Sequence, residues 1–164
     1  MLKGSITEEP GSPTPPKKPL SVHATMLDYT YDIKEMRDES DLIVVGEVIS
    51  QYEPSRATVG SVIRVIKVFR GEQSDEIVVF QFGQINEETV IEPNKTYLFF
   101  MASQNIEGQY YTKGGEQGIF LIDNEILRPQ DIIMKEEFET KFNEEDVFNI
   151  NAKSTSEFEK WLSE

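Results

Sequence analysis

Three observations predict that this 164-residue sequence folds into a mainly β structure with a few accessory helices. Short runs rich in β-branched residues recur along the chain, with Gly, Asn and Pro between them. Helical periodicity without a competing strand pattern is confined to a short stretch near residue 33 and to the C-terminal part. Strands and helices do not alternate, which argues against a parallel sheet. Together these patterns favour an antiparallel sandwich or barrel.

The first two elements predicted after the N-terminal region are a short helix and a strand. Residues 31–38 have apolar side chains three positions apart, and Thr30 or Asp32 can cap this helix. Residues 42–50 are rich in Leu, Ile and Val, which predicts a strand. Gly46 within that strand indicates a bend or a bulge.

Residues 57–70 fit both a helix and a strand by periodicity, since a helix would also collect several apolar side chains on one side. Six of the ten residues 59–68 are β-branched and Gly71 ends the run, so we predict a long strand. Its apolar groups on both faces would follow if the strand coils from one wall of a barrel to the other.

Five shorter runs complete the predicted sheet, and the dipeptide Asp123-Asn124 would form the turn between the last two. They are residues 76–82, 96–101, 109–112, 118–122 and 125–127.

The C-terminal part predicts two amphipathic helices, the second opened by a capping box over residues 154–157. We expect their apolar faces to pack on the chain's own barrel. These faces are formed by Met134, Phe138 and Phe142 in the first helix and by Phe158, Trp161 and Leu162 in the second.

The N-terminal region has a different composition. Residues 10–19 hold five of the eight prolines, and ten residues of polyproline II would reach about 31 Å. We predict a Pro-rich disordered tether over residues 1–24 and a single domain over residues 25–164, with a C-terminal helical extension from about residue 129. The chain shows neither a signal peptide nor a transmembrane run. This leaves a cytosolic protein with a tail or an exported protein anchored upstream of this chain, and we favour the second.

The net charge of -14 disfavours nucleic acid as a partner, because affinity for the phosphate backbone depends on Lys and Arg. Residues 25–128 alone carry 18 acidic and nine basic side chains, so the acidity is spread through the globular part. We expect a protein partner, no nucleic acid, and a monomer or weak oligomer kept soluble by like charge.

Several kinds of catalytic and metal site are excluded by the residues themselves. The chain has no Cys, and its single imidazole, His23, lies beside the predicted tether, where no partner can orient it. The acidic run at residues 144–146 lacks the spacing of a calcium loop, and Asn94-Lys95-Thr96, although a glycosylation sequon, is explained by a turn. We therefore predict no enzyme activity, no catalytic residues, no metal site and no cofactor. Close carboxylate pairs are expected by chance among 30 acidic residues.

The glycine-rich segment Gly114–Gly118 has neither the spacing nor the ending of a phosphate loop. We predict a tight, bulged crossing in which Gln117 satisfies backbone groups.

Three segments carry a resemblance to a known family: residues 41–48, residues 63–71 and residues 94–100. Their sequences, DLIVVGEV, IRVIKVFRG and NKTYLFF, resemble the netrin-like modules of tissue inhibitors of metalloproteinases and their bacterial relatives. The resemblance spans about residues 31–128. It implies an antiparallel, five- to six-stranded OB-like Greek-key barrel and, for the bacterial relatives, an exported and often lipid-anchored setting. The inhibitory activity is not implied, because it depends on an N-terminal Cys that this chain lacks.

The leading functional hypothesis is a non-enzymatic, extracytoplasmic binding module tethered at the bacterial cell surface. The alternatives are a carboxylate-based glycan hydrolase and a cytosolic protein-interaction domain. By analogy with the fold, the binding face would lie near the 84–92 loop. Its residues would be Tyr97, Tyr110, Tyr111, Lys113 and Gln117.

Overall fold

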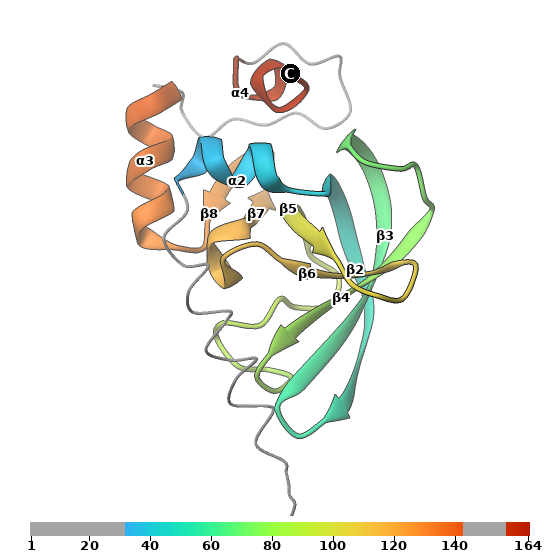
Figure 1. Cartoon of the computed structure of the whole chain (residues 1–164). Coiled ribbons are helices and arrows are strands. Elements are labelled where there is room, and N and C mark those ends of the chain that lie inside the picture. Colours follow the sequence, from blue (N-terminus) through green and yellow to red (C-terminus); the bar gives the residue numbers. More distant parts are fainter. Residues whose placement is uncertain (1–31, 143–156) are drawn as a thin grey trace, which may run out of the picture.

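The computed structural model describes residues 32–142 and 157–164, which form a β-barrel with helices gathered against one side (Figure 1). The predicted tether, His23, the acidic run at residues 144–146 and the capping residues 154–156 lie outside the described residues. In chain order the elements are α2 (Ile33–Glu39), β2 (Leu42–Ser55), β3 (Thr58–Arg70), β4 (Glu76–Phe82), β5 (Thr96–Ser103), β6 (Gln109–Thr112), the 3-10 helix η2 (Gly115–Gly118), β7 (Ile119–Asp123), β8 (Ile126–Pro129), α3 (Ile132–Phe142) and α4 (Glu157–Leu162).

Five strands close into a barrel, which confirms the predicted OB-like fold. The sheet order is β2-β3-β4-β6-β5-β7-β8, and an additional pairing of β2 with β5 closes the ring. Every pair is antiparallel except β4 with β6, which is parallel. The expectation of a purely antiparallel sheet is wrong on this point for a geometric reason. Strand directions cannot alternate around a closed ring with an odd number of strands.

The long hairpin of β2 and β3 forms a curved wall on the right of the barrel in Figure 1. Strand β2 runs to Ser55, five residues beyond the predicted end, and its ladder with β3 shifts register between Val45 and Gly46. This shift confirms the irregularity predicted at Gly46. Strand β3 follows its predicted range closely. Near its C-terminal end the strand passes from one side of the sheet to the other, because Val65 packs in the barrel interior and Phe69 packs between the barrel and the helices.

Two hydrophobic cores share the strands. The barrel interior is mostly aliphatic and is built from alternate residues of the ring, such as Val44, Ile63 and Val79, together with Phe99. The second core lies between the outer side of the barrel and the helices, and it contains a cluster of aromatic rings. Its rings are those of Phe100, Phe120, Phe138, Phe142 and Phe158, with Trp161 and Phe69 packed against them.

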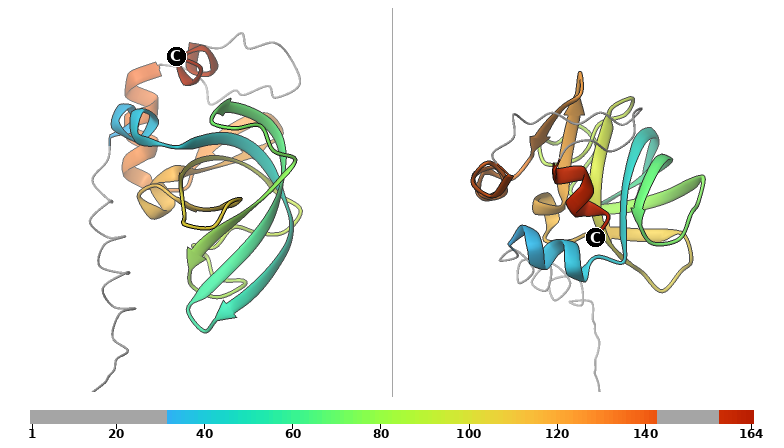
Figure 2. Two further views of the ribbon diagram at one scale, coloured as in Figure 1. Left: turned by 45° about the vertical axis from the view of Figure 1, so that its right-hand side comes forward. Right: turned by 90° about the horizontal axis from the view of Figure 1, so that it is seen from above.

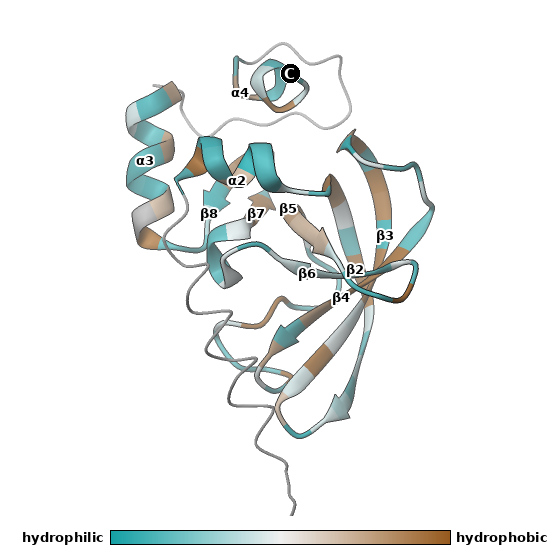
Figure 3. Cartoon of the chain, in the orientation of Figure 1, coloured by the Kyte–Doolittle hydropathy of each residue, from teal (hydrophilic) through white to brown (hydrophobic). Residues whose placement is uncertain are grey.

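The helices are fixed by caps and by contacts with each other. Asp32, one of the two predicted caps, forms a capping box with Glu35 at the start of α2. The other predicted cap, Thr30, lies outside the described residues. The backbone N–H of Ile33 donates to Oε1 of Glu137 at 2.7 Å, which ties α2 to α3. Figure 2 shows α2, α3 and α4 on the same side of the barrel, and Figure 3 shows hydrophilic residues along each of them. The prediction that the C-terminal helices pack on their own barrel is confirmed.

The turn between β7 and β8 lies one residue later than predicted. Asp123 pairs with Ile126, and the two residues between them, Asn124 and Glu125, have φ values of 52° and 67°. A two-residue hairpin with both central residues at positive φ is a type I′ turn, whose twist matches that of the strands. None of the helices in the described ranges is long and apolar enough to cross a membrane.

Candidate functional site

The outer side of β2, β3, β4 and β6 carries a continuous row of aromatic residues. Tyr52 pairs with Gly60, Gly60 with Phe80, and Phe80 with Tyr111, each on the neighbouring strand. Directly paired residues point to the same face of a sheet, so these side chains share one surface. Four strands at the usual spacing make the row about 14 Å wide. We call this surface the open wall.

Above and below this row the open wall mixes apolar and polar residues, since Val62 pairs with Ser50 and Phe82 pairs with Thr58. Alternation along β4 puts Val78 and Phe82 on the same side as Phe80, and Val62 of β3 pairs with Val78. Tyr52, Phe82 and Tyr111 keep 43%, 42% and 39% of their surface exposed. An exposed patch of large apolar side chains on one face is typical of an interaction site.

Gly60 explains how the row is packed. A Cβ atom at this position would lie 2.6 Å from Cζ of Tyr52, so only glycine leaves room for the ring to lie across β3. There Tyr52 meets Phe80 edge to face, with ring centroids 6.3 Å apart. The sequence analysis did not single out these three residues. The signal that could have found them is one glycine in a β-branched strand, flanked by aromatic residues on the adjacent strands.

Charged residues border the open wall. Glu76 begins β4 on the outward side, and Glu107 lies in the loop before β6. Glu53 follows Tyr52 and points to the opposite face, where its Oε2 accepts from the N–H of Ile85 at 3.0 Å. Arg64 lies on the same side of β3 as Val62 and forms an ion pair with Glu47. The tip of the β2–β3 hairpin adds Arg56, so this rim has three carboxylates and two guanidinium groups.

The five residues predicted as a binding face do not share one surface. Tyr97, Lys113 and Gln117 are buried. The ring of Tyr97 lies in the barrel interior beside Phe99, and its hydroxyl accepts a hydrogen bond from the backbone N–H of Glu92 at 3.0 Å. Burial raises the pKa of Tyr97 above its ordinary value.

Tyr110 and Tyr111 are adjacent on β6 and point to opposite faces. Tyr110 packs against the barrel interior, and its pKa is raised by burial and by the carboxylates of Glu72, Asp41 and Glu107. Tyr111 alone of the five belongs to the open wall. A binding role for the other four stays a prediction.

The glycine-rich segment is a tight crossing, as its composition predicts. Gly114 and Gly115 have φ values of 64° and 62°, and the chain then turns through η2. A Cβ atom at Gly118 would lie 2.6 Å from the carbonyl oxygen of Lys113 and 2.8 Å from that of Phe100, so two backbones approach closely there. Gln117 is buried beside them, and its part in satisfying backbone groups stays a prediction.

The 84–92 loop, expected at the rim of the binding face, helps to close the barrel instead. Val90 and Ile91 are buried, and Ile91 belongs to the interior core. The side chain of Gln81 holds this segment, since it donates to the carbonyl oxygen of Thr89 at 3.1 Å and accepts from the N–H of Ile91 at 3.0 Å.

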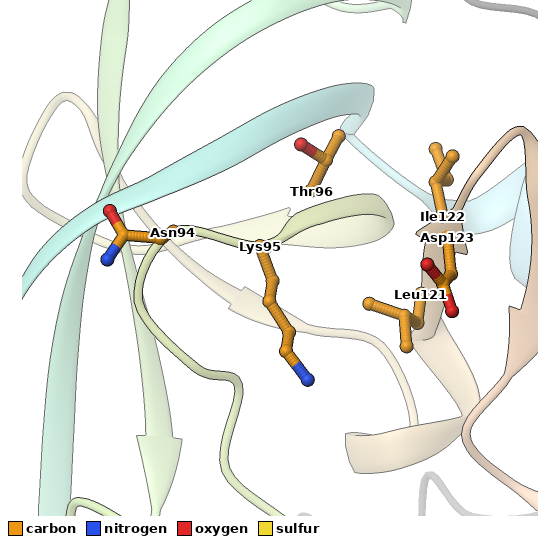
Figure 4. A pocket seen from close by; sticks show the side chains of 6 residues that line it. All are labelled: Asn94, Lys95, Thr96, Leu121, Ile122 and Asp123. Carbon is orange, nitrogen blue, oxygen red and sulfur yellow. The ribbon is translucent and has the colours of Figure 1, made fainter.

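A shallow depression of about 230 Å³ lies between the start of β5 and the end of β7 (Figure 4). It is smaller than the usual range for small-molecule pockets. Lys95 and Leu121 border it from opposite sides, and its only carboxylate, Asp123, lies 3.9 Å from Nε of Arg128. The hydrolase alternative needs two carboxylates facing one cleft, so this depression does not favour it.

No protein-family model matches the chain, and the comparison with curated proteins finds no match. The resemblance to netrin-like modules therefore stays a prediction.

The acidic side chains of the described residues do not form a candidate metal site. Among residues 32–142 and 157–164, no group of three or more His, Asp or Glu side chains is arranged to hold a metal ion. Glu116 of η2 is half-buried, and its pKa is raised by burial and by the carboxylates of Asp131 and Glu88. Asp131 is engaged as a helix cap, because its Oδ1 accepts from the N–H of Met134 at 3.0 Å.

Proposed function

We propose that this chain is a non-enzymatic binding module that holds an extended peptide segment of a partner protein on the open wall. The observation that carries the proposal is the aromatic row of Tyr52, Phe80 and Tyr111 across four neighbouring strands. On OB-like barrels, the face of the second and third barrel strands is the one that usually binds ligands. In this chain those strands are β3 and β4, which lie in the middle of the row.

Tyrosine and phenylalanine suit such a role because they offer large apolar contact areas and lose little conformational entropy on binding. Tyr52 and Tyr111 also keep their rings partly exposed. An extended peptide can cross several strands and place alternate side chains against these rings.

Charge decides between classes of ligand. Aromatic rings on an OB-like barrel can also stack nucleic-acid bases, but the three rim carboxylates and the net charge of -14 would repel phosphates. A neutral glycan could stack on the rings without using the rim. A peptide with basic residues uses both features, and it is therefore the ligand we propose.

The proposal places the module outside the cytoplasm, held at the bacterial cell surface through its N-terminal region. The Pro-rich composition of residues 10–19 and the resemblance to exported bacterial proteins support this setting. Cell fractionation of the untruncated gene product tests it. Recovery with the membrane or cell-surface fraction is expected, and recovery in the cytosol would contradict the proposed location and favour a cytosolic interaction domain.

Selection of random displayed peptides on the full chain tests the binding function. Calorimetry with the selected peptides would compare the wild type with Tyr52→Thr and Tyr111→Thr, which remove the ring and introduce a β-branched residue suited to a strand. The control is Ile132→Thr, because Ile132 of α3 is 76% exposed and lies away from the open wall. We expect at least tenfold weaker binding, about 1.4 kcal/mol, for each tyrosine variant and no change for the control.

Equal affinity in all four proteins would contradict the proposal. So would a glycan array in which oligosaccharides bind through Tyr52 and Tyr111 while the selected peptides do not.

A further inference from the structure

We propose that residues 10–19 of the same chain are an internal ligand of the open wall and compete there with the partner. The inference rests on the proposed function, since it assigns an occupant to the same surface. Three independent features support it: the spacing of the prolines, the distribution of charge and the length of the connecting segment.

The prolines of this segment have the period of a polyproline II helix. Pro10, Pro13, Pro16 and Pro19 are each three residues apart, whereas Pro15 falls outside this series. Polyproline II has three residues per turn and rises about 3.1 Å per residue, so the four prolines of the series would lie along one edge, about 9 Å apart. Aromatic-lined surfaces are the usual binding sites for such edges.

The dimensions of the open wall agree with this period. The row from Tyr52 to Tyr111 crosses four strands and is about 14 Å wide. About five residues of polyproline II cover this distance. Two successive prolines of the series can therefore contact the rings at the same time.

The charges are complementary. Residues 10–19 contain Lys17 and Lys18 and no acidic residue. The rim of the open wall has three carboxylates, those of Glu47, Glu76 and Glu107, against two guanidinium groups. The rim therefore has one negative charge in excess, whereas the two lysines make the segment positive. Electrostatic complementarity of this kind favours one orientation of a bound peptide.

The connecting segment is long enough for binding within one molecule. The described chain begins at Asp32, directly before α2, so residues 20–31 separate the prolines from the barrel domain. Twelve residues span up to about 40 Å, and a folded unit of this size is roughly 35 Å across. A flexible linker gives a millimolar effective concentration when its root-mean-square length, about 20 Å for twelve residues, matches the distance that it spans. At longer distances the effective concentration is lower, and the contacts with the prolines must be correspondingly stronger to occupy the open wall.

Because the chain has no Cys, a single introduced Cys can carry a spin label, and this allows a direct test. A nitroxide attached to Ser12→Cys in the full chain would broaden the NMR signals of nearby backbone amides. We expect broadening at Tyr52, Gly60, Phe80 and Tyr111. Pro13→Ala together with Pro16→Ala should abolish it, whereas the matched control Pro15→Ala should leave it in place, because Pro15 lies outside the three-residue series.

Three outcomes would overturn the inference. They are broadening confined to the amides of α2, broadening that survives the double proline variant, and broadening of an isotope-labelled chain by a separate, nitroxide-labelled copy. The last outcome would assign the contact to a second molecule.

Competition provides a second measurement that separates this inference from the proposed function. If the segment occupies the open wall for half to nine-tenths of the time, the Pro13→Ala, Pro16→Ala chain should bind the selected peptides about two to ten times more tightly than the wild type. Unchanged affinity that still depends on Tyr52 and Tyr111 would contradict the internal ligand while leaving the proposed function intact. Broadening at the open wall without any binding of selected peptides would support the internal ligand and contradict the proposed function.

Discussion

The outer surface of this barrel has two aromatic sides that differ in what covers them. On the side of β5 and β7, the rings of Phe100 and Phe120 lie beneath α2, α3 and α4 and are fully buried. We call this side the covered wall. On the open wall, Tyr52 and Tyr111 keep about two-fifths of their surface exposed. Among the described residues, outward-facing rings are fully buried only where the helices cover the barrel, and the rings of the open wall stay partly exposed.

The largest expected effect is on stability, because a mutation in the covered wall should lower the free energy of unfolding more than one in the open wall. Phe138 of α3 packs 4.8 Å from Phe158 and 6.2 Å from Phe120, measured between ring centroids. Phe138→Ala should lower the free energy of unfolding by about 3 to 5 kcal/mol because it leaves a cavity among packed rings. Tyr111→Thr should cost about 1 kcal/mol or less, because its ring already faces solvent. Urea denaturation with matched m-values measures both, and equal losses would contradict the distinction between the walls.

A smaller effect concerns the attachment of α4 to the covered wall. The guanidinium of Arg37 lies 4.3 Å from the ring centroid of Trp161 and donates to the carbonyl oxygen of Trp161 at 2.9 Å. Arg37→Met should weaken the docking of α4 by about 1.5 to 3 kcal/mol. Trp161 is the only tryptophan, so its fluorescence reports this contact directly through a red shift and stronger quenching.

The control for this prediction is Lys34→Met on the same helix, because Lys34 forms only an exposed ion pair with Asp38. Its tryptophan emission should match the wild type. An unchanged spectrum in Arg37→Met would show that Arg37 does not hold α4.

A modest effect is expected from closing the space at Gly60. In Gly60→Ala the new methyl group would displace the ring of Tyr52, which is the end of a flexible side chain, so stability should fall by about 1 kcal/mol or less. The edge-to-face contact between Tyr52 and Phe80 should be lost, and peptide affinity should fall with it. Gly108→Ala is a comparison for backbone strain without a clash, because its φ is 82° and its Cβ atom would meet nothing within 4 Å. It should lower stability but leave the contact between Tyr52 and Phe80 and the peptide affinity unchanged. Retained ring contacts in Gly60→Ala, seen by nuclear Overhauser effects, would argue against this packing.

The smallest effect is a pH dependence at Glu116. Burial and the carboxylates of Asp131 and Glu88 raise its pKa in the folded chain, so the folded state holds this proton more tightly than the unfolded state. The stability contributed by this group is therefore present at low pH. It is lost as the pH rises from the ordinary glutamate pKa, about 4.3, through the raised value. Glu116→Gln should match the wild type at low pH and become more stable than it toward neutral pH. A stability difference that does not vary with pH would contradict this assignment.

Local patterns were sufficient to predict most of the fold. The β-branched content of residues 57–70 outweighed a competing helical periodicity, and the strand is observed as β3. Phenylalanines four residues apart correctly predicted α3 and its burial against the barrel. The turn of β7 and β8 was displaced by one residue, because its position depends on which residues adopt positive φ.

The candidate site could not be predicted in the same way. The open wall depends on the register of four strands, and Tyr52, Phe80 and Tyr111 are far apart in sequence. Alternation along β6 predicts that Tyr110 and Tyr111 face opposite sides, but only the closed barrel decides which side is outward. Tyr97 is buried for a similar reason, since the 84–92 segment folds over the barrel end and supplies the partner for its hydroxyl.

The most direct test of the central claim is an NMR map of the full chain as a selected peptide is added. The account predicts chemical-shift changes at Tyr52, Gly60, Phe80 and Tyr111 that saturate together, with the amides of α3 unaffected. Changes centred on Lys95 and Asp123 at the depression, or spread over the covered wall, would contradict the claim that the open wall is the binding surface.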